Sequence, residues 1–169
     1  YMHKPNRDNW ISRRRNKRIN VSKRVDFEYE GKSQFAFTRD IGARGAFLRT
    51  SRPIPLKSEV DFAIKLESDQ EPVVVRGLVV RLNETGSEVG MALSFLVDDQ
   101  EESLAAISHF VLQSFETKLV SRLERNPNDQ RALYEMSEIE RERDNIPEAE
   151  QYLRTLVDIN PEHERANFD

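Results

Sequence analysis

The hydrophobic period of this chain changes once, near Phe95, and that change constrains the fold more than any other feature. Before it, apolar residues alternate with polar ones in short runs, as at Val60 and Phe62. After it, apolar residues recur every three or four positions, as at Ile107 and Phe110. Alternation indicates β-strands, whereas the longer spacing indicates amphipathic helices. We therefore predict an α+β protein in which the strands come first and the helices follow.

Turn residues divide the alternating part into six or seven short strands at even spacing. The strand-like runs cover residues 19–29, 35–38, 46–50, 60–66, 73–82 and 89–95. A series of short strands separated by turn signals predicts a small antiparallel barrel or sandwich.

The part with helical spacing predicts one long helix and two shorter ones. The long helix is expected over about 99–125, with an apolar stripe from Leu104 to Leu123 that includes Val120. The dipeptide Asn126-Pro127 ends this helix, and helices over 129–143 and 147–159 follow. The same dipeptide recurs at 160–161, an interval of 34 residues, which is the length of a tetratricopeptide repeat.

Positive charge is concentrated at the N-terminus. Residues 1–24 contain nine Lys or Arg and one acidic residue, whereas the remainder contains 17 basic and 29 acidic residues. Five of the six residues at 13–18 are basic. Such uneven charge predicts a local anion-binding arm on an otherwise acidic protein. By itself the pattern is equally compatible with non-specific contact to nucleic acid or lipid.

Several patterns that enzymes and metalloproteins need are missing from the sequence. There is no cysteine, so neither a disulfide nor a thiolate metal site can form. The three histidines are scattered, and no nucleophile–base pair or phosphate loop is present. No apolar run approaches the roughly 18 residues of a membrane span. We predict a cytoplasmic protein that is not an enzyme, holds no metal and does not span a membrane.

Two motifs follow one another in the β-patterned part. Arg14 and Arg18 match the spacing Arg-x-x-x-Arg, and Asp40 and Gly45 match Asp/Asn-x-Ser-x-x-Gly, with Gly42 at the serine position. Further similarities lie at 45–48, 77–81 and 90–95. Over residues 13–97 the chain thus resembles the PilZ domain, the bacterial receptor module for cyclic di-GMP. The resemblance implies a small antiparallel β-barrel of six or seven strands.

The resemblance also implies that the chain binds cyclic di-GMP as a ligand, with no prosthetic group. Arg14 and Arg18 would hold its guanines or phosphates, because a guanidinium fork bonds either of them bidentately. Asp40 would accept hydrogen bonds from guanine N–H groups, and Gly45 would allow the turn. Further basic side chains that could contribute are Arg13, Arg15, Arg44 and Arg81.

The last two helices resemble one tetratricopeptide repeat across residues 130–161. Apolar or helix-breaking residues stand where such a repeat has them, at Leu133, Met136, Ala149, Leu153, Leu156 and Pro161. Glu140 departs from the pattern, because an aromatic residue is usual there. The resemblance implies a protein partner bound by the C-terminal helices. The expected organisation is a basic flexible arm at 1–18, a PilZ-like barrel at 19–98, a long helix at 99–125 and a tetratricopeptide-like hairpin at 126–169.

Other functions stay open at the level of sequence. Because Gly42 removes a hydroxyl from the second motif, the domain could be a ligand-blind, PilZ-like adaptor that binds only proteins. The basic arm could bind nucleic acid, which the acidic remainder of the chain disfavours. The long helix, with its wide apolar stripe, could mediate a homodimer.

Overall fold

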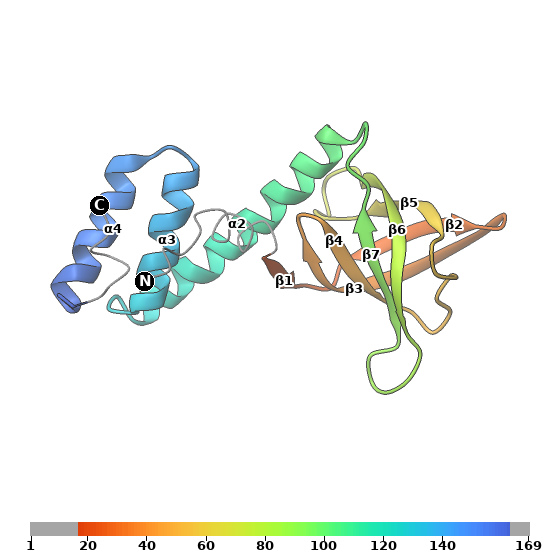
Figure 1. Ribbon diagram of the computed structural model, residues 1–169, viewed down its shortest axis with the longest axis horizontal. Coiled ribbons are helices and arrows are strands. Elements are labelled where there is room, and N and C mark those ends of the chain that lie inside the picture. The colour runs from red at the N-terminus through yellow and green to blue at the C-terminus, as the bar shows by residue number, and fades with distance from the viewer. Residues whose placement is uncertain (1–16, 163–169) are drawn as a thin grey trace, which may run out of the picture. The chain divides into compact units, whose positions relative to one another are not determined.

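The computed structural model describes residues 17–162, which form seven strands followed by three helices (Figure 1). The strands are β1 (Arg18–Asn20), β2 (Arg24–Tyr29), β3 (Lys32–Gly42), β4 (Gly45–Arg49), β5 (Glu59–Ile64), β6 (Val73–Asn83) and β7 (Gly90–Phe95). The helices are α2 (Glu101–Arg125), α3 (Gln130–Glu142) and α4 (Ile146–Ile159). The predicted change from strands to helices after Phe95 is confirmed.

Six of the strands close into an antiparallel barrel. The sheet order is β3-β2-β5-β6-β7-β4, and β4 pairs back with β3 to complete the ring. The seventh strand, β1, lies outside this ring and pairs with the last residues of β3, with Arg18 opposite Gly42. Closure leaves the six ring strands without a free edge. The predicted α+β fold with a small antiparallel barrel is therefore confirmed.

Alternating side chains fill the barrel, as the period of two predicts. The largest of those that are fully buried include Phe62, Ile64, Val25, Val75, Val79 and Met91. On β3, however, the alternating aromatic residues lie on the outer face. Phe35 is 56% exposed and Phe37 is 43% exposed, and their rings meet edge to face at 6.1 Å. Alternation in the sequence identified the strand but could not say which of its faces is inside.

The side chain of Gln100 fastens the start of α2 to the barrel. Strand β7 ends at Phe95, so the backbone of Arg76 on β6 extends past it. The Arg76 N–H donates to Gln100 Oε1, and Gln100 Nε2 donates to the Arg76 carbonyl at 3.1 Å. Ser103 Oγ donates to the carbonyl of Val74 at 2.7 Å. The loop and first turn of α2 thus satisfy backbone groups that the sheet leaves open.

The chain divides into two compact units at Val111 and Leu112, inside α2. The first contains the barrel with the beginning of α2, where Ile107 and Phe110 are buried. In the second, Leu119 of α2 packs with Ala132, Met136 and Ile139 of α3. Within residues 17–162, no helix combines the length and apolar character that crossing a membrane requires. The predicted boundaries at 18, 98 and 125 remain predictions.

The apolar stripe of α2 is narrower than the sequence suggested. Leu119 is buried, whereas its neighbour Val120 is exposed. Successive residues of a helix point about 100° apart, and Val120 falls on the side that is turned away from the cluster around Leu119. Counting Val120 in the stripe was therefore wrong.

Glu140 is buried in α3 but its charge is compensated. Asn145 Nδ2, in the turn before α4, donates to Glu140 Oε2 at 2.9 Å, and Arg143 Nη1 donates to Oε1 at 3.4 Å. Arg143 also binds Glu116 of α2 through two hydrogen bonds of 2.8 and 2.5 Å. These bonds lower the pKa of the Glu116 carboxyl, and burial together with the nearby acids raises the pKa of Tyr152. A polar network therefore stands where an aromatic residue was expected.

Asp129 is the N-cap of α3, and we predict that Asp129→Ala destabilises the helical unit by about 1 kcal/mol. Asp129 Oδ1 accepts from the Ala132 N–H at 3.0 Å, which lowers the pKa of the carboxyl below its ordinary 3.8, and Arg122 adds to the effect. A carboxyl with a lowered pKa stabilises the fold fully above its ordinary pKa, and the benefit is lost as the pH falls through the folded value. Urea denaturation, followed by circular dichroism at 222 nm and repeated at several pH values, measures the loss of stability and its dependence on pH.

The matched control is Asp129→Asn, which keeps an acceptor oxygen for the cap and removes the charge. We expect it to lose less stability than Asp129→Ala. A deficit in Asp129→Ala that is the same at pH 7 and pH 2.5 would contradict the contribution of the charge, and equal losses in Asp129→Ala and Asp129→Asn would contradict the assigned cap.

Candidate functional site

A β-bulge in β3 turns Asp40 to the outside of the barrel. Thr38 pairs with Leu48 of β4, but Asp40 pairs with Phe47, so Arg39 is an extra residue between them. Strict alternation would place Asp40 on the same inner face as Thr38. The extra residue shifts the alternation by one, and Arg39 and Asp40 both lie against Phe47 on the outer face. The bulge therefore creates a polar site on the barrel wall.

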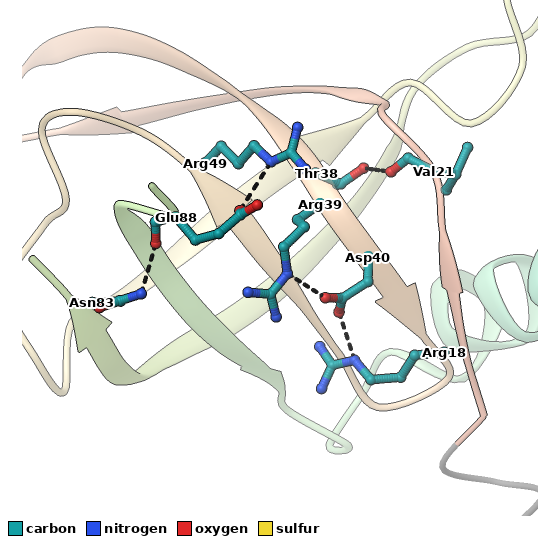
Figure 2. A network of polar contacts seen from close by, with 8 residues as sticks. All are labelled: Arg18, Val21, Thr38, Arg39, Asp40, Arg49, Asn83 and Glu88. Carbon is teal, nitrogen blue, oxygen red and sulfur yellow. Dashed lines mark hydrogen bonds and ion pairs between the residues drawn. The ribbon is translucent and has the colours of Figure 1, made fainter. Parts of the chain in front are cut away.

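Two arginines bind the carboxylate of Asp40 (Figure 2). Arg18 Nε donates to Oδ1 at 2.7 Å, and Arg39 Nε donates to Oδ2 at 2.8 Å. The Asp40 side chain is only 8% exposed, whereas those of Arg18 and Arg39 are 47% and 32% exposed. A buried carboxylate is costly unless it is paired and hydrogen-bonded. Here one ion pair comes from the same strand and the other from β1.

Each arginine uses only its Nε atom in these contacts. Neither guanidinium makes a further hydrogen bond to any residue among 17–162, so toward this part of the chain the Nη atoms stay available as donors. The Arg39 guanidinium lies 4.0 Å from the ring centroid of Phe47, which is a cation–π contact. In Figure 2 the Nη ends of both arginines extend to the same side of Asp40. Such an arrangement suits a ligand rich in acceptor oxygens.

Thr38 holds the connection that delivers Arg18 to the site. Its hydroxyl donates to the Val21 carbonyl at 2.5 Å and accepts from the Lys23 N–H at 2.8 Å. The Thr38 N–H donates to the Lys23 carbonyl at 2.9 Å. The link between β1 and β2 is thereby tied to β3 by three hydrogen bonds. Thr38 is fully buried, which makes the replacement of its hydroxyl costly.

Gly42 lies where β1 approaches β3 most closely. A Cβ atom there would come within 3.1 Å of both Arg18 Cγ and the Lys17 carbonyl oxygen. Few real Cβ atoms sit so close to their neighbours, so a serine would push against the strand that carries Arg18. The residue that departs from the expected motif is therefore also the residue that lets β1 pair closely.

The structure brings together only some of the residues that the sequence indicated. Arg18, Asp40 and Gly42 lie side by side, as described above. At Gly45 a Cβ atom would come within 2.2 Å of the Leu93 carbonyl oxygen, so close packing of β4 on β7 requires glycine. The φ angle of Gly45 is not in the left-handed region, so the expected role in a turn is replaced by close approach. Arg13, Arg14 and Arg15 lie outside the described residues.

The remaining arginines from the prediction lie elsewhere on the barrel. Arg81 is exposed on β6, opposite Ala92 of β7. Arg44 is exposed between β3 and β4, and its carbonyl accepts from the Phe95 N–H at 2.8 Å. A small hollow of about 230 Å³ adjoins it, lined by Ala43, Arg44, Phe95, Val97, Leu104 and Ser108. Neither arginine makes a hydrogen bond or ion pair to Arg18, Arg39 or Asp40.

Arg39 is the residue that sequence reasoning missed. It directly precedes Asp40, and under strict alternation two adjacent strand residues would face opposite sides. Only the bulge puts both on one face. The sole sequence signal was the position of a cation beside the motif's first acidic residue.

Comparison with known families and structures identifies this architecture. The model of the PilZ domain matches residues 12–113 of the chain. The chain belongs to the PilZ domain family. Its members are typically receptors for cyclic di-GMP. The match spans the barrel, the site around Asp40 and the first half of α2. None of the curated proteins matches the chain.

Solved structures share the barrel at low sequence identity. The inhibitor of motility MotI/DgrA of Bacillus subtilis matches with a TM-score of 0.50 and 16% identity over 60% of this chain. The PilZ domain of CeSA from a cellulose-synthesizing bacterium matches with a TM-score of 0.43 and 20% identity over 56% of this chain. The PlzA protein of Borreliella burgdorferi, solved in complex with c-di-GMP, matches with a TM-score of 0.43 and 14% identity over 62% of this chain. The matched parts cover 50%, 96% and 44% of those chains, and the likeness concerns the fold alone.

We predict that Gly42→Ser destabilises the barrel by about 1 kcal/mol, because the new Cβ presses on Lys17 and Arg18. Faster amide hydrogen exchange at Ile19 and Asn20 of β1 should accompany the loss. Urea denaturation and exchange measured by NMR test the two effects.

Two variants separate the Cβ atom from the hydroxyl. Gly42→Ala adds the same Cβ and should cost as much, whereas Ala43→Ser adds a hydroxyl at a position that already carries a Cβ. If the amides of β1 exchange in Gly42→Ala at the same rate as in the wild-type protein, the close approach of β1 and β3 does not need glycine.

Proposed function

We propose that this protein is a cytoplasmic, non-enzymatic receptor and adaptor that binds cyclic di-GMP and passes the state of that second messenger to a protein partner. Membership of the PilZ family supports the ligand. The observation that carries the proposal is the pair of guanidinium groups that Asp40 holds with their Nη atoms available. No cluster of metal-binding side chains occurs within residues 17–162, and the proposal needs none.

The chemistry of the ligand fits this pair. Cyclic di-GMP carries two phosphates and two guanines, and a guanidinium fork can bond phosphate oxygens or guanine O6 and N7. Asp40 can accept from guanine N–H groups on the edge that the arginines leave. Arg14, in the arm, would supply the first arginine of the motif. Each contact would be charge-assisted, and such hydrogen bonds are about twice as strong as neutral ones.

The absence of a hydroxyl at Gly42 weakens the site without removing it. One lost hydrogen bond costs about 0.5–1.5 kcal/mol, which reaches roughly a tenfold loss of affinity at its upper end. The same glycine allows β1 to bring Arg18 onto Asp40. The loss of one contact is thus offset by better placement of another.

A route from the site to α2 supports the transmission of a signal. Lys23, in the connection that Thr38 holds, places its Nζ atom 5.4 Å from the ring centroid of Phe110. Phe110 is a buried residue of α2. A ligand that moves Arg18 would therefore pull on a connection that contacts this helix. We propose that α3 and α4, which resemble one tetratricopeptide repeat, offer the surface for the partner, including the exposed Ile146.

A ligand-blind adaptor is the second candidate. The observation in its favour is that Asp40 already has a partner for each of its two oxygens, while Gly42 offers no hydroxyl. In that case the arginines would serve only to join β1 to the barrel. Binding of the partner would then be unchanged in Arg14→Ala.

Calorimetric titration of cyclic di-GMP into the wild-type protein tests the receptor. We expect micromolar or tighter binding, reduced at least tenfold in Arg18→Ala and in Asp40→Ala and abolished in Arg14→Ala/Arg18→Ala, because each loses a charge-assisted contact. The control is Arg154→Ala, which removes an exposed arginine of α4 whose ion pair within residues 17–162 is with Glu150 at 3.9 Å. No heat at high protein concentration, backed by equilibrium dialysis, would rule out the receptor and favour the adaptor.

A further inference from the structure

We propose that Arg39 is a second ligand-binding arginine of this site, which supplies the donors that Gly42 cannot. The inference rests on the proposed function and adds to it a residue outside both sequence motifs. Arg39 would bind a pair of acceptor atoms on a cyclic purine dinucleotide. Either a phosphodiester or the O6 and N7 edge of guanine presents such a pair.

The bulge gives Arg39 a direction that an ordinary strand residue would not have. Because Arg39 is the extra residue between Thr38 and Asp40, its side chain lies beside that of Asp40. Its Nε atom is bound at 2.8 Å, and its guanidinium lies on the Phe47 ring at 4.0 Å. Phe47 is itself fully buried. The two contacts fix the guanidinium on its edge and on its face.

The Nη atoms of Arg39 are the donors that would contact the ligand. The Nη atoms of Arg39 donate to no residue among 17–162, and 32% of the side chain is exposed. A fork that is already held in place loses little conformational entropy when it binds. Asp40 fixes Arg18 in the same way through its other oxygen. The two forks thus converge on one carboxylate and offer donors together.

Two other arginines on the outer barrel face are paired with exposed carboxylates, although Arg24 also lies over an aromatic ring, that of Phe35, at 4.5 Å. Arg49 pairs with Glu88 at 3.3 Å, and the side chains are 54% and 40% exposed. Arg24 pairs with Asp26 at 3.1 Å, and both side chains are about half exposed. Exposed pairs of this kind are weakly held. Only the Arg39 pair, among these three, is anchored to a carboxylate that is nearly removed from solvent.

The test is calorimetric titration of cyclic di-GMP into wild-type protein, Arg39→Ala, Arg39→Lys and Arg39→Gln, with Arg49→Ala as the matched control. We expect at least a tenfold loss of affinity in Arg39→Ala and partial recovery in Arg39→Lys, which keeps the charge but not the fork. Arg49→Ala should bind within twofold of wild type. Unfolding midpoints of all variants are measured in parallel.

Arg39→Gln separates binding from folding. Its amide can still donate to Asp40, so the site keeps its architecture while the cationic fork is lost. A tenfold loss in this variant, at an unchanged unfolding midpoint, supports a direct contact. Affinity within twofold of wild type in both Arg39→Ala and Arg39→Gln overturns the inference and leaves the proposed function intact. No binding by the wild-type protein overturns both.

A ligand analogue identifies the atoms that Arg39 contacts. The cyclic dinucleotide of 7-deazaguanosine keeps both phosphates and lacks N7. If Arg39 binds the guanine edge, the affinity ratio between wild type and Arg39→Ala shrinks with the analogue. If it binds a phosphodiester, the ratio stays the same. Each result supports the inference and names the source of the acceptor atoms, and a ratio near one with both ligands overturns it.

Discussion

The carboxylate of Asp40, removed from solvent on the outer wall of the barrel, is the group on which the site depends. A charge in that position must be paired, and its two oxygens take one arginine each. One partner, Arg18, comes from β1, so the ion pair also fixes the strand that lies outside the ring. The same interaction therefore orders the end of the basic arm and orients the donors that a ligand would meet.

The local packing around Asp40 explains why the second motif can deviate. β1 lies close to β3 beside Gly42, which has no side chain, and Thr38 ties the β1–β2 connection down. A serine would add a donor and acceptor but would crowd Arg18. The chain instead places an arginine, Arg39, on the bulge three residues earlier. The missing serine at Gly42 and the arginine at Arg39 are thus explained together, which a comparison of single motif positions does not reveal.

In the helical part, charge is likewise compensated locally. Glu140 stands at an inward position of α3, and groups of the following turn bond both of its oxygens. Arg143 links it to Glu116 of α2 through a bidentate pair. Because its hydrogen bonds are made, the charged residue Glu140 can be buried at a position where the repeat pattern expects an aromatic residue. The helices can therefore pack as a hairpin although their sequence departs from that pattern.

The sequence by itself determined the order of strands and helices and an antiparallel barrel or sandwich, because periodicity is a local property, and the motif spacing supplied the candidates Arg18 and Asp40. Only the tertiary structure decided which face each residue takes. A bulge shifts the alternation of β3, so Asp40 faces outward and Arg39 joins it. The structure also decided that Phe37 faces outward from β3 and that Val120 of α2 lies outside the core. Register, closure and bulges arise from pairing between distant segments, and spacing along one segment carries no record of them.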